Sequence, residues 1–255
     1  MIVVFHEDFY PVYTTDPAAA TGRMEAIIDA IGDGATFRSA RQAEAALIAA
    51  VHTPAHIEAV RRRGLYDIAA LAAGAAVQAA EIGLTQPAFG LVRPPGHHAS
   101  SDSCWGFCYF NNMAVALRAL KDAGRIGSAF LLDFDLHYGD GNVNTLGGRD
   151  WVTILNPEAA GRGAYRDQVR RALEATRADM IAVSAGFDHH RDDWGGLLET
   201  DDYRDFGRWV QEAAARNGGG CFGLLEGGYN HGVLGANVKA FLEGLDGPEP
   251  EGGLP

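Results

Sequence analysis

Four short apolar runs recur from residue 88 onward, and each ends in a loop rich in glycine and polar side chains. Helical patterns separate these runs over residues 112–123, 165–177 and 202–216, and the runs themselves cover 88–92, 129–132, 180–185 and 221–225. Alternation of strand, polar loop and helix predicts an α/β fold: a doubly wound, mostly parallel sheet flanked by helices. Ligands bind outside the carboxyl ends of the strands in such sheets, so the four loops predict one shared active site.

The first half of the chain contributes fewer clear signals. A strand is predicted over residues 2–5, helices over 24–31, 41–50 and 65–83, and a connection around Phe37. Thr53 and Pro54 read as the N-cap and first residue of a further helix. His52 and His56, which flank this turn, are expected to be structural. We expect a single domain over residues 1–246 and a disordered tail over 247–255.

The run over residues 129–132 leads directly into the strongest chemical signal. Asp133, Asp135 and His137 follow it at alternate positions. Alternate residues of an extended chain point to the same side, so two carboxylates and an imidazole emerge together. These are the ligand types of a catalytic zinc or a similar divalent ion. A lone Asp-x-Asp would more often be an acidic loop, but the in-phase histidine favours a metal site.

A third metal ligand must come from another strand. Asp188 is the best candidate because its glycine-containing turn follows the run over residues 180–185 directly. His189 and His190 are less favoured, since they come one and two residues later and point elsewhere. Three protein ligands leave a position open for water and substrate, as in catalytic rather than structural sites.

Proton-transfer groups are the next requirement of a hydrolytic site. His97 and His98 follow two prolines and a glycine, a stiff loop that fixes both imidazoles. Imidazole serves as base or acid near neutral pH when a carboxylate holds its second nitrogen, and Asp133 and Asp140 are available for this. Tyr229, after a Gly-Gly turn, could donate to an oxyanion. Taken alone, each motif would read as surface histidines or a packing aromatic; together they indicate amide hydrolysis.

Composition limits the classes of molecule that the protein is expected to bind and its expected cellular location. The 255 residues include 33 acidic and 21 basic side chains, for a net charge of −12. This argues against a nucleic acid and permits a cationic substrate. Three cysteines without C-x-x-C spacing give neither a disulfide framework nor a structural zinc site. The acidic N-terminus lacks signal-peptide features, and no apolar run approaches ~18 residues, so we expect no membrane span and a cytoplasmic location.

Five ordered motifs extend these signals along most of the chain. Together they resemble the histone deacetylase and acetylpolyamine amidohydrolase superfamily, which has the arginase–deacetylase fold, and two of them are similar to its class II or polyamine branch. The motifs are Arg93-Pro-Pro-Gly-His-His-Ala99, Gly106-Phe-Cys-Tyr-Phe-Asn-Asn112, Asp133-Phe-Asp-Leu-His-Tyr-Gly-Asp-Gly141, Ser184-Ala-Gly-Phe-Asp188 and Leu225-Glu-Gly-Gly-Tyr-Asn230.

The resemblance implies a metal complement. One zinc ion would be held by Asp135, His137 and Asp188. A monovalent cation, K⁺ or Na⁺, would be held by backbone carbonyls around Asp133, Asp135 and His137. A two-manganese ureohydrolase on the same fold would need extra Asp and His ligands here to bridge a second ion.

The resemblance also implies roles for the proton-transfer groups. His98 would be the general base, paired with Asp140. His97 would be an electrostatic partner or acid, paired with Asp133. Tyr229 would polarise the acyl carbonyl.

The substrate tunnel is where the chain departs from the family. The resemblance implies that Gly106 and Phe107 line one wall. The segment over residues 142–165 is much shorter than usual and lacks the aromatic Pro-Gly-Thr-Gly loop that supplies the second wall. The loop over 60–65 is also shorter, and Tyr138 stands where a second histidine is common.

These observations predict a zinc-dependent amidohydrolase that removes an acetyl or other short acyl group from a primary amine. The expected substrate is a small cationic amine such as an acetylpolyamine, with a protein lysine deacetylase as the alternative. A two-manganese ureohydrolase and a non-catalytic binding module are less favoured. The sequence does not predict an oligomeric state.

Overall fold

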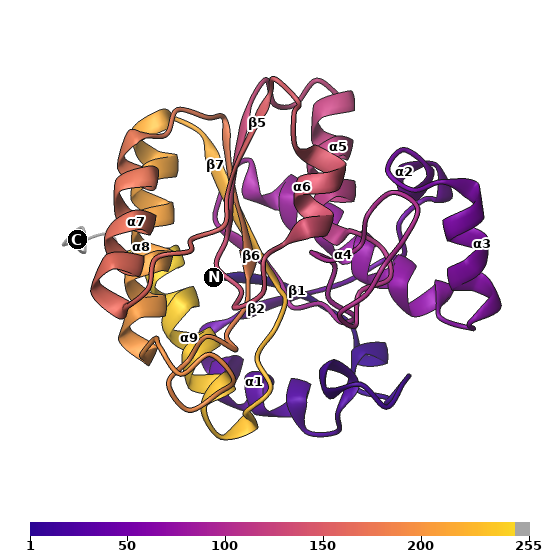
Figure 1. Cartoon of the computed structure of the whole chain (residues 1–255), viewed down its shortest axis with the longest axis horizontal. Coiled ribbons are helices and arrows are strands. Elements are labelled where there is room, and N and C mark those ends of the chain that lie inside the picture. Colours follow the sequence, from indigo (N-terminus) through magenta and orange to yellow (C-terminus); the bar gives the residue numbers. More distant parts are fainter. Residues whose placement is uncertain (248–255) are drawn as a thin grey trace, which may run out of the picture.

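One parallel sheet runs through the middle of the molecule (Figure 1). The computed structural model describes residues 1–247, so all but the first residue of the tail predicted for 247–255 lies outside the described range. Within that range, seven strands pair in the order β2-β1-β3-β7-β6-β4-β5, all in parallel register. They are β1 (Ile2–Phe5), β2 (Thr36–Ser39), β3 (Ala88–Gly90), β4 (Ala129–Asp133), β5 (Val152–Leu155), β6 (Met180–Ala185) and β7 (Gly220–Leu225).

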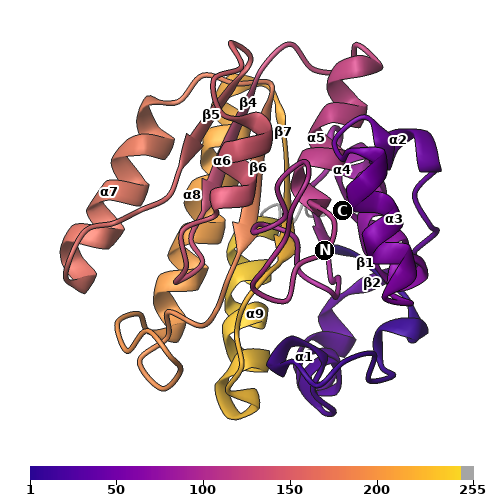
Figure 2. The same ribbon diagram turned by 45° about the vertical axis from the view of Figure 1, so that its right-hand side comes forward.

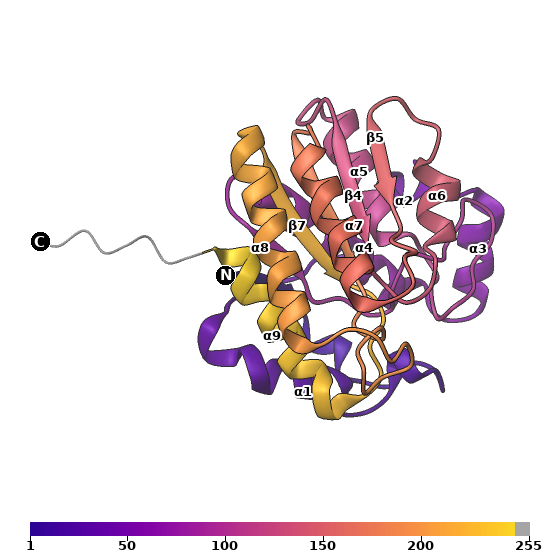
Figure 3. The same ribbon diagram turned by 60° about the vertical axis from the view of Figure 1, so that its left-hand side comes forward.

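Helices cover both faces of the sheet, as a doubly wound fold requires (Figure 2). One layer contains α1 (Arg23–Ile31), α7 (Arg162–Ala175), α8 (Thr200–Asn217) and α9 (His231–Asp246). In Figure 3, α7, α8 and α9 lie side by side in front of the strands. The other layer contains α2 (Ala45–Ala49), α3 (Pro54–Arg62), α4 (Tyr66–Gly83), α5 (Asn112–Asp122) and α6 (Asp140–Leu146). None of the helices described over residues 1–247 is long and apolar enough to cross a membrane.

Burial explains which strands could be predicted from the sequence. Every residue of β4, β6 and β7 is buried, because these strands lie in the sheet interior with helices on both faces. The two edge strands are different: β2 is exposed along its whole length, and β5 is only partly covered. The prediction of a connection around Phe37 was therefore wrong, since Phe37 lies within β2 and pairs with Val3 of β1.

Strand order brings the polar loops together. The runs predicted to end in functional loops became β3, β4, β6 and β7, and these four strands are consecutive neighbours in the sheet. Their carboxyl ends lie at one edge, so the loops after them share one region of the surface. The fold thus confirms the expected doubly wound, mostly parallel architecture.

Candidate active site

The three predicted metal ligands lie together at the carboxyl ends of β4 and β6. Asp135, His137 and Asp188 each offer a ligand atom, and these atoms lie within 4.8 Å of one another. Both carboxylates are buried, whereas the imidazole of His137 is partly exposed. The imidazole Nδ1 is 3.2 Å from Asp135 Oδ1 and 3.1 Å from Asp188 Oδ2. The cluster therefore opens to solvent only on the histidine side.

Backbone groups fix both carboxylates in place. Asp135 accepts the amide N–H groups of His137, at 2.9 Å, and of Gly227, at 2.8 Å, while Asp188 accepts that of Leu136 at 3.1 Å. A Cβ on Gly227 would lie 2.6 Å from Asp135 Oδ2 and 2.7 Å from Asp188 Oδ2, so only glycine fits beside them. The turn after β7 thus completes a tight cradle around the two acidic groups.

The charges in this cradle fit a cation. Asp188 Oδ2 is buried and makes no hydrogen bond, although it lies close to His137. Burial and the neighbouring Asp135 raise the pKa of Asp188 to about 6, and interactions with the two carboxylates raise the pKa of His137 to about 10. Two adjacent buried carboxylates require a compensating positive charge. Two carboxylates and one imidazole suit a catalytic divalent ion in that place.

A second group of potential ligands, His97, Cys108 and Glu226, is committed to hydrogen bonds. Glu226 accepts the backbone N–H groups of Gly96 and His97 and the hydroxyl of Ser184. Burial raises the pKa of the Cys108 thiol well above its usual range, so it stays protonated and binds metal poorly. We assign this group to support of the histidine loop.

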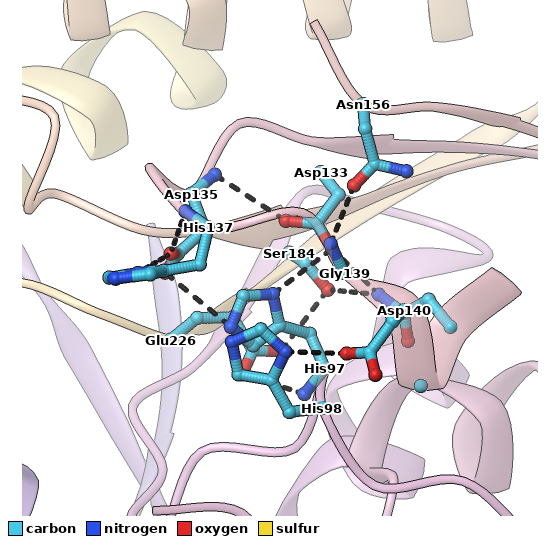
Figure 4. Close-up of polar contacts among 12 residues, drawn as sticks. His97, His98, Asp133, Asp135, His137, Gly139, Asp140, Asn156, Ser184 and Glu226 are labelled. Carbon is cyan, nitrogen blue, oxygen red and sulfur yellow. Dashed lines mark hydrogen bonds and ion pairs between the residues drawn. The ribbon is translucent and has the colours of Figure 1, made fainter. Parts of the chain in front are cut away.

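Each histidine of the Pro-Pro-Gly-His-His loop contacts its own carboxylate (Figure 4). Nδ1 of His97 is 3.2 Å from Asp133 Oδ2, and Nδ1 of His98 is 2.7 Å from Asp140 Oδ1. The two imidazole centroids are 4.0 Å apart, and Nε2 of His97 is 3.8 Å from Asp135. The structure therefore brings both predicted His–Asp pairs next to the candidate metal ligands.

The two histidines differ in charge. Burial opposes protonation of His97, but Asp135 and Asp133 outweigh it and raise the pKa of His97 well above its usual value. Burial and the positive charge of His97 lower the pKa of His98 to about 4, despite its contact with Asp140. At neutral pH His98 is therefore neutral. Its Nδ1–H donates to Asp140, which leaves Nε2 able to accept a proton.

Tyr229 and Phe107 lie on the rim of the site. Their rings meet edge to face, with centroids 5.8 Å apart. The backbone N–H groups of Tyr229 and Asn230 both donate to Asp193 at 2.8 Å, which fixes the turn after β7. Gly106 passes so close to His98 that a Cβ there would lie 2.3 Å from the imidazole. The predicted tunnel residues thus adjoin the predicted base.

The other histidines considered as ligands lie outside the metal cluster. His189 packs edge to face against Tyr165, and His190 accepts the backbone N–H of Asp192. His52 and His56 are buried and hydrogen-bonded to backbone groups.

Sequence reasoning missed two tryptophans at the rim. Trp105 donates its indole N–H to Asp140 Oδ2 at 2.8 Å, and its ring lies 3.8 Å from that of His98. Trp194 stacks on Tyr229 with centroids 4.1 Å apart. Both are about half exposed, at 54% and 53%, which is unusual for so large an apolar side chain. The available signal was that Trp105 directly precedes the Gly-Phe-Cys motif and that Trp194 follows the Gly-Phe-Asp motif by six residues.

Known proteins resemble this chain in sequence and in fold. The family described as histone deacetylase domain matches residues 18–159 and 155–245. A probable deacetylase of Methanothermobacter thermautotrophicus is 30% identical, over 98% of this chain and 92% of its own length. Acetylpolyamine amidohydrolase 2 of Pseudomonas aeruginosa is 30% identical, over 62% of this chain and 56% of its own. The crystal structure of an acetylpolyamine aminohydrolase from Burkholderia pseudomallei shares the fold, with a TM-score of 0.83 at 22% identity over 97% of this chain and 99% of its own. The chain belongs to the histone deacetylase domain family.

Proposed function

We propose that this protein is a zinc-dependent amidohydrolase that removes an acetyl or other short acyl group from a primary amine. One observation carries the proposal above the others. A neutral histidine, His98, is paired with Asp140 directly beside a cradle of metal-type ligands. A base that is unprotonated at neutral pH, next to a cation site, suits deprotonation of an attacking water.

Asp135, His137 and Asp188 would hold the zinc ion. When bound, the ion polarises the amide carbonyl and lowers the pKa of a water molecule. A two-manganese ureohydrolase site would need further free carboxylates. Asp133 and Asp140 are each engaged by a histidine, which argues against a second bridged ion. The K⁺ or Na⁺ site expected around Asp133 remains a prediction.

The side chains around the cradle have distinct tasks in the proposed reaction. His98 accepts the proton of the attacking water at Nε2, while Asp140 holds the imidazole and stabilises its positive charge. As the water oxygen bonds to the acyl carbon, negative charge develops on the carbonyl oxygen, and Tyr229 donates its hydroxyl to that oxyanion. The C–N bond then breaks, the amine leaves with a proton from the histidine pair, and the acid is released. Burial raises the pKa of the Tyr229 phenol far above neutrality, so it remains a donor throughout.

The substrate we favour is a small cationic acetylated amine. Exposed acidic residues lie close in sequence to both rim tryptophans: Asp102 precedes Trp105 by three positions, and Asp192 precedes Trp194 by two. With the net charge of −12, these groups can attract a cation to the rim. A relative named for acetylpolyamine hydrolysis lends further support. Deacetylation of protein lysines is the competing activity.

The deciding experiment compares kcat/KM of the zinc-loaded protein for N-acetylputrescine and for an acetyl-lysine peptide, at low and high salt. The polyamine should be preferred, with an advantage that shrinks as salt screens the field. Replacing Asp102 and Asp192 by asparagine should shrink it in the same way. A peptide preferred at both salt levels would indicate a protein deacetylase instead, and no turnover of either would refute the amidohydrolase assignment.

A further inference from the structure

A row of six aromatic rings lies beside the metal cradle. Each ring packs near the next, from Trp105 at one end of the row to Phe107 at the other, and these two residues are two positions apart in the chain. The centroid separations are 3.8 Å for Trp105–His98, 6.0 Å for His98–His137, 6.0 Å for His137–Trp194, 4.1 Å for Trp194–Tyr229 and 5.8 Å for Tyr229–Phe107. A substrate that reaches the cradle past this row of rings meets an aromatic surface.

Trp194 lies between His137 and Tyr229 in this row. It presents one face to Tyr229, at an interplanar angle of 27°, and meets His137 edge to face at 86°. The connection between β5 and α7, residues 156–161, contains no aromatic residue. This connection therefore cannot supply the second wall in the way that the family's longer loop does, and Trp194 is the aromatic side chain that stands beside His137 and Tyr229.

The backbone around Trp194 is tied to both catalytic loops. Asp193 Oδ1 accepts the N–H of Trp194 at 2.8 Å, while its Oδ2 accepts those of Tyr229 and Asn230. The N–H of Gly195 donates to the carbonyl of Asp188 at 2.7 Å. The stack between Trp194 and Tyr229 is thus anchored at its backbone on both sides. A carboxylate that receives three N–H groups is a rigid support.

We propose that Trp194 is the second wall of the substrate channel and the positioning residue of Tyr229. This inference rests on the proposed function. Stacking fixes the plane of the phenol and so the direction in which its O–H donates. The exposed remainder of the indole gives the methylene chain of the amine an apolar surface to lie against. The first effect acts on kcat and the second on KM.

A double-mutant cycle with Tyr229 separates the two effects, using an acetyl-lysine coumarin amide as substrate. Trp194→Ala should lower kcat roughly tenfold, the upper end expected for an aromatic pair, and raise KM. In a Tyr229→Phe background there is no phenol to position, so Trp194→Ala should change kcat by less than about twofold. The rise in KM should persist in both backgrounds.

Further variants keep the test independent of folding. Trp194→Phe retains a stacking ring and should restore most of kcat. Trp194→Leu keeps an apolar wall without the stack, so it should preserve KM better than kcat. Trp209→Phe is a matched control: Trp209 lies on α8, against Phe206 and two arginines, and the change should leave both constants unaltered.

The outcomes distinguish this inference from the proposed function. If the wild-type protein is inactive, both the proposed function and the inference about Trp194 are refuted. If Tyr229→Phe keeps full kcat, the phenol has no catalytic role and Trp194 cannot act by positioning it. If Tyr229→Phe is impaired but Trp194→Ala lowers kcat equally in both backgrounds, only the Trp194 assignment is overturned. Unchanged kcat and KM in Trp194→Ala would overturn it as well.

Discussion

The carboxylate of Asp140 is held between His98 and Trp105, one oxygen to each. Oδ1 is 2.7 Å from His98 Nδ1, and Oδ2 accepts the indole N–H of Trp105 at 2.8 Å. Hydrogen bonds from Trp105 and His98 lower the pKa of Asp140, although partial burial opposes this. A carboxylate with both oxygens engaged cannot rotate freely. The imidazole that it orients is therefore restricted to one tautomer and one direction.

His98 is predicted to be the base, and its removal tests this first. His98→Ala should reduce kcat by a factor on the order of 10²–10⁴, the usual contribution of general acid–base catalysis. Zinc content, measured by elemental analysis, should stay at the wild-type value because His98 is not among the candidate ligands. His97→Ala should slow proton removal from water less. Near-normal kcat in His98→Ala would refute the assignment.

Trp105 is predicted to act on the same base through Asp140. Trp105→Phe deletes the indole N–H but keeps a ring to pack on His98, so kcat should fall by a few-fold to about tenfold, in line with the loss of one hydrogen bond to a charged group at a partly exposed site. KM should change little. Steady-state kinetics beside the Trp209→Phe control measures this. A change confined to KM would mean that Trp105 contacts substrate only.

Asp188 is predicted to be essential for the metal. Asp188→Ala leaves Asp135 and His137 as the remaining pair, and a site with two ligands should bind zinc far more weakly. Dialysed wild-type protein should retain about one zinc per chain, and the variant much less, with turnover abolished. Asp167→Ala, at an exposed position of α7 away from the site, is the matched control. Stoichiometric zinc in Asp188→Ala, or two manganese ions in the wild type, would contradict the prediction.

The sequence predicted strands best where every residue of the strand is buried. The apolar runs that became β4, β6 and β7 are covered on both faces, so their composition alone marked them as strands. The polar residues at their ends could then be placed at one edge of the sheet. Edge strands give no such signal. The exposed strand Thr36–Ser39 pairs with β1 through its backbone, and its side chains form no continuous apolar run.

The site shows the same division between local pattern and tertiary contact. The in-phase placement of Asp135 and His137 is a property of a few consecutive residues and could be read directly. The stack of Trp194 on Tyr229 joins residues from loops after different strands, and no periodicity links them. The same holds for the N–H groups of Tyr229 and Asn230, which both donate to Asp193. Contacts of this kind depend on how loops fold over the sheet edge.

His52 is predicted to make stability depend on pH through its support of the histidine loop. Its Nδ1–H donates to the carbonyl of Ser100 at 3.0 Å, and its Nε2 accepts the N–H of Asn111 at 2.9 Å. Both ring nitrogens are thus used by the neutral form. Burial and the nearby His56 lower the pKa of His52 to about 4. Protonation would convert the acceptor into a donor that faces another donor.

The sign of the effect follows from the two pKa values. The unfolded chain protonates His52 near pH 6.5, but the folded protein does so only near pH 4. The contribution of His52 to stability is therefore fully present above pH 6.5 and is lost as the pH falls toward 4, by up to about 3 kcal/mol. Urea unfolding of the wild type and of His52→Gln between pH 7 and 4 measures it. The wild-type free energy of unfolding should fall more steeply with decreasing pH than that of the variant. Parallel curves would show that protonation of His52 does not contribute to the pH dependence of stability.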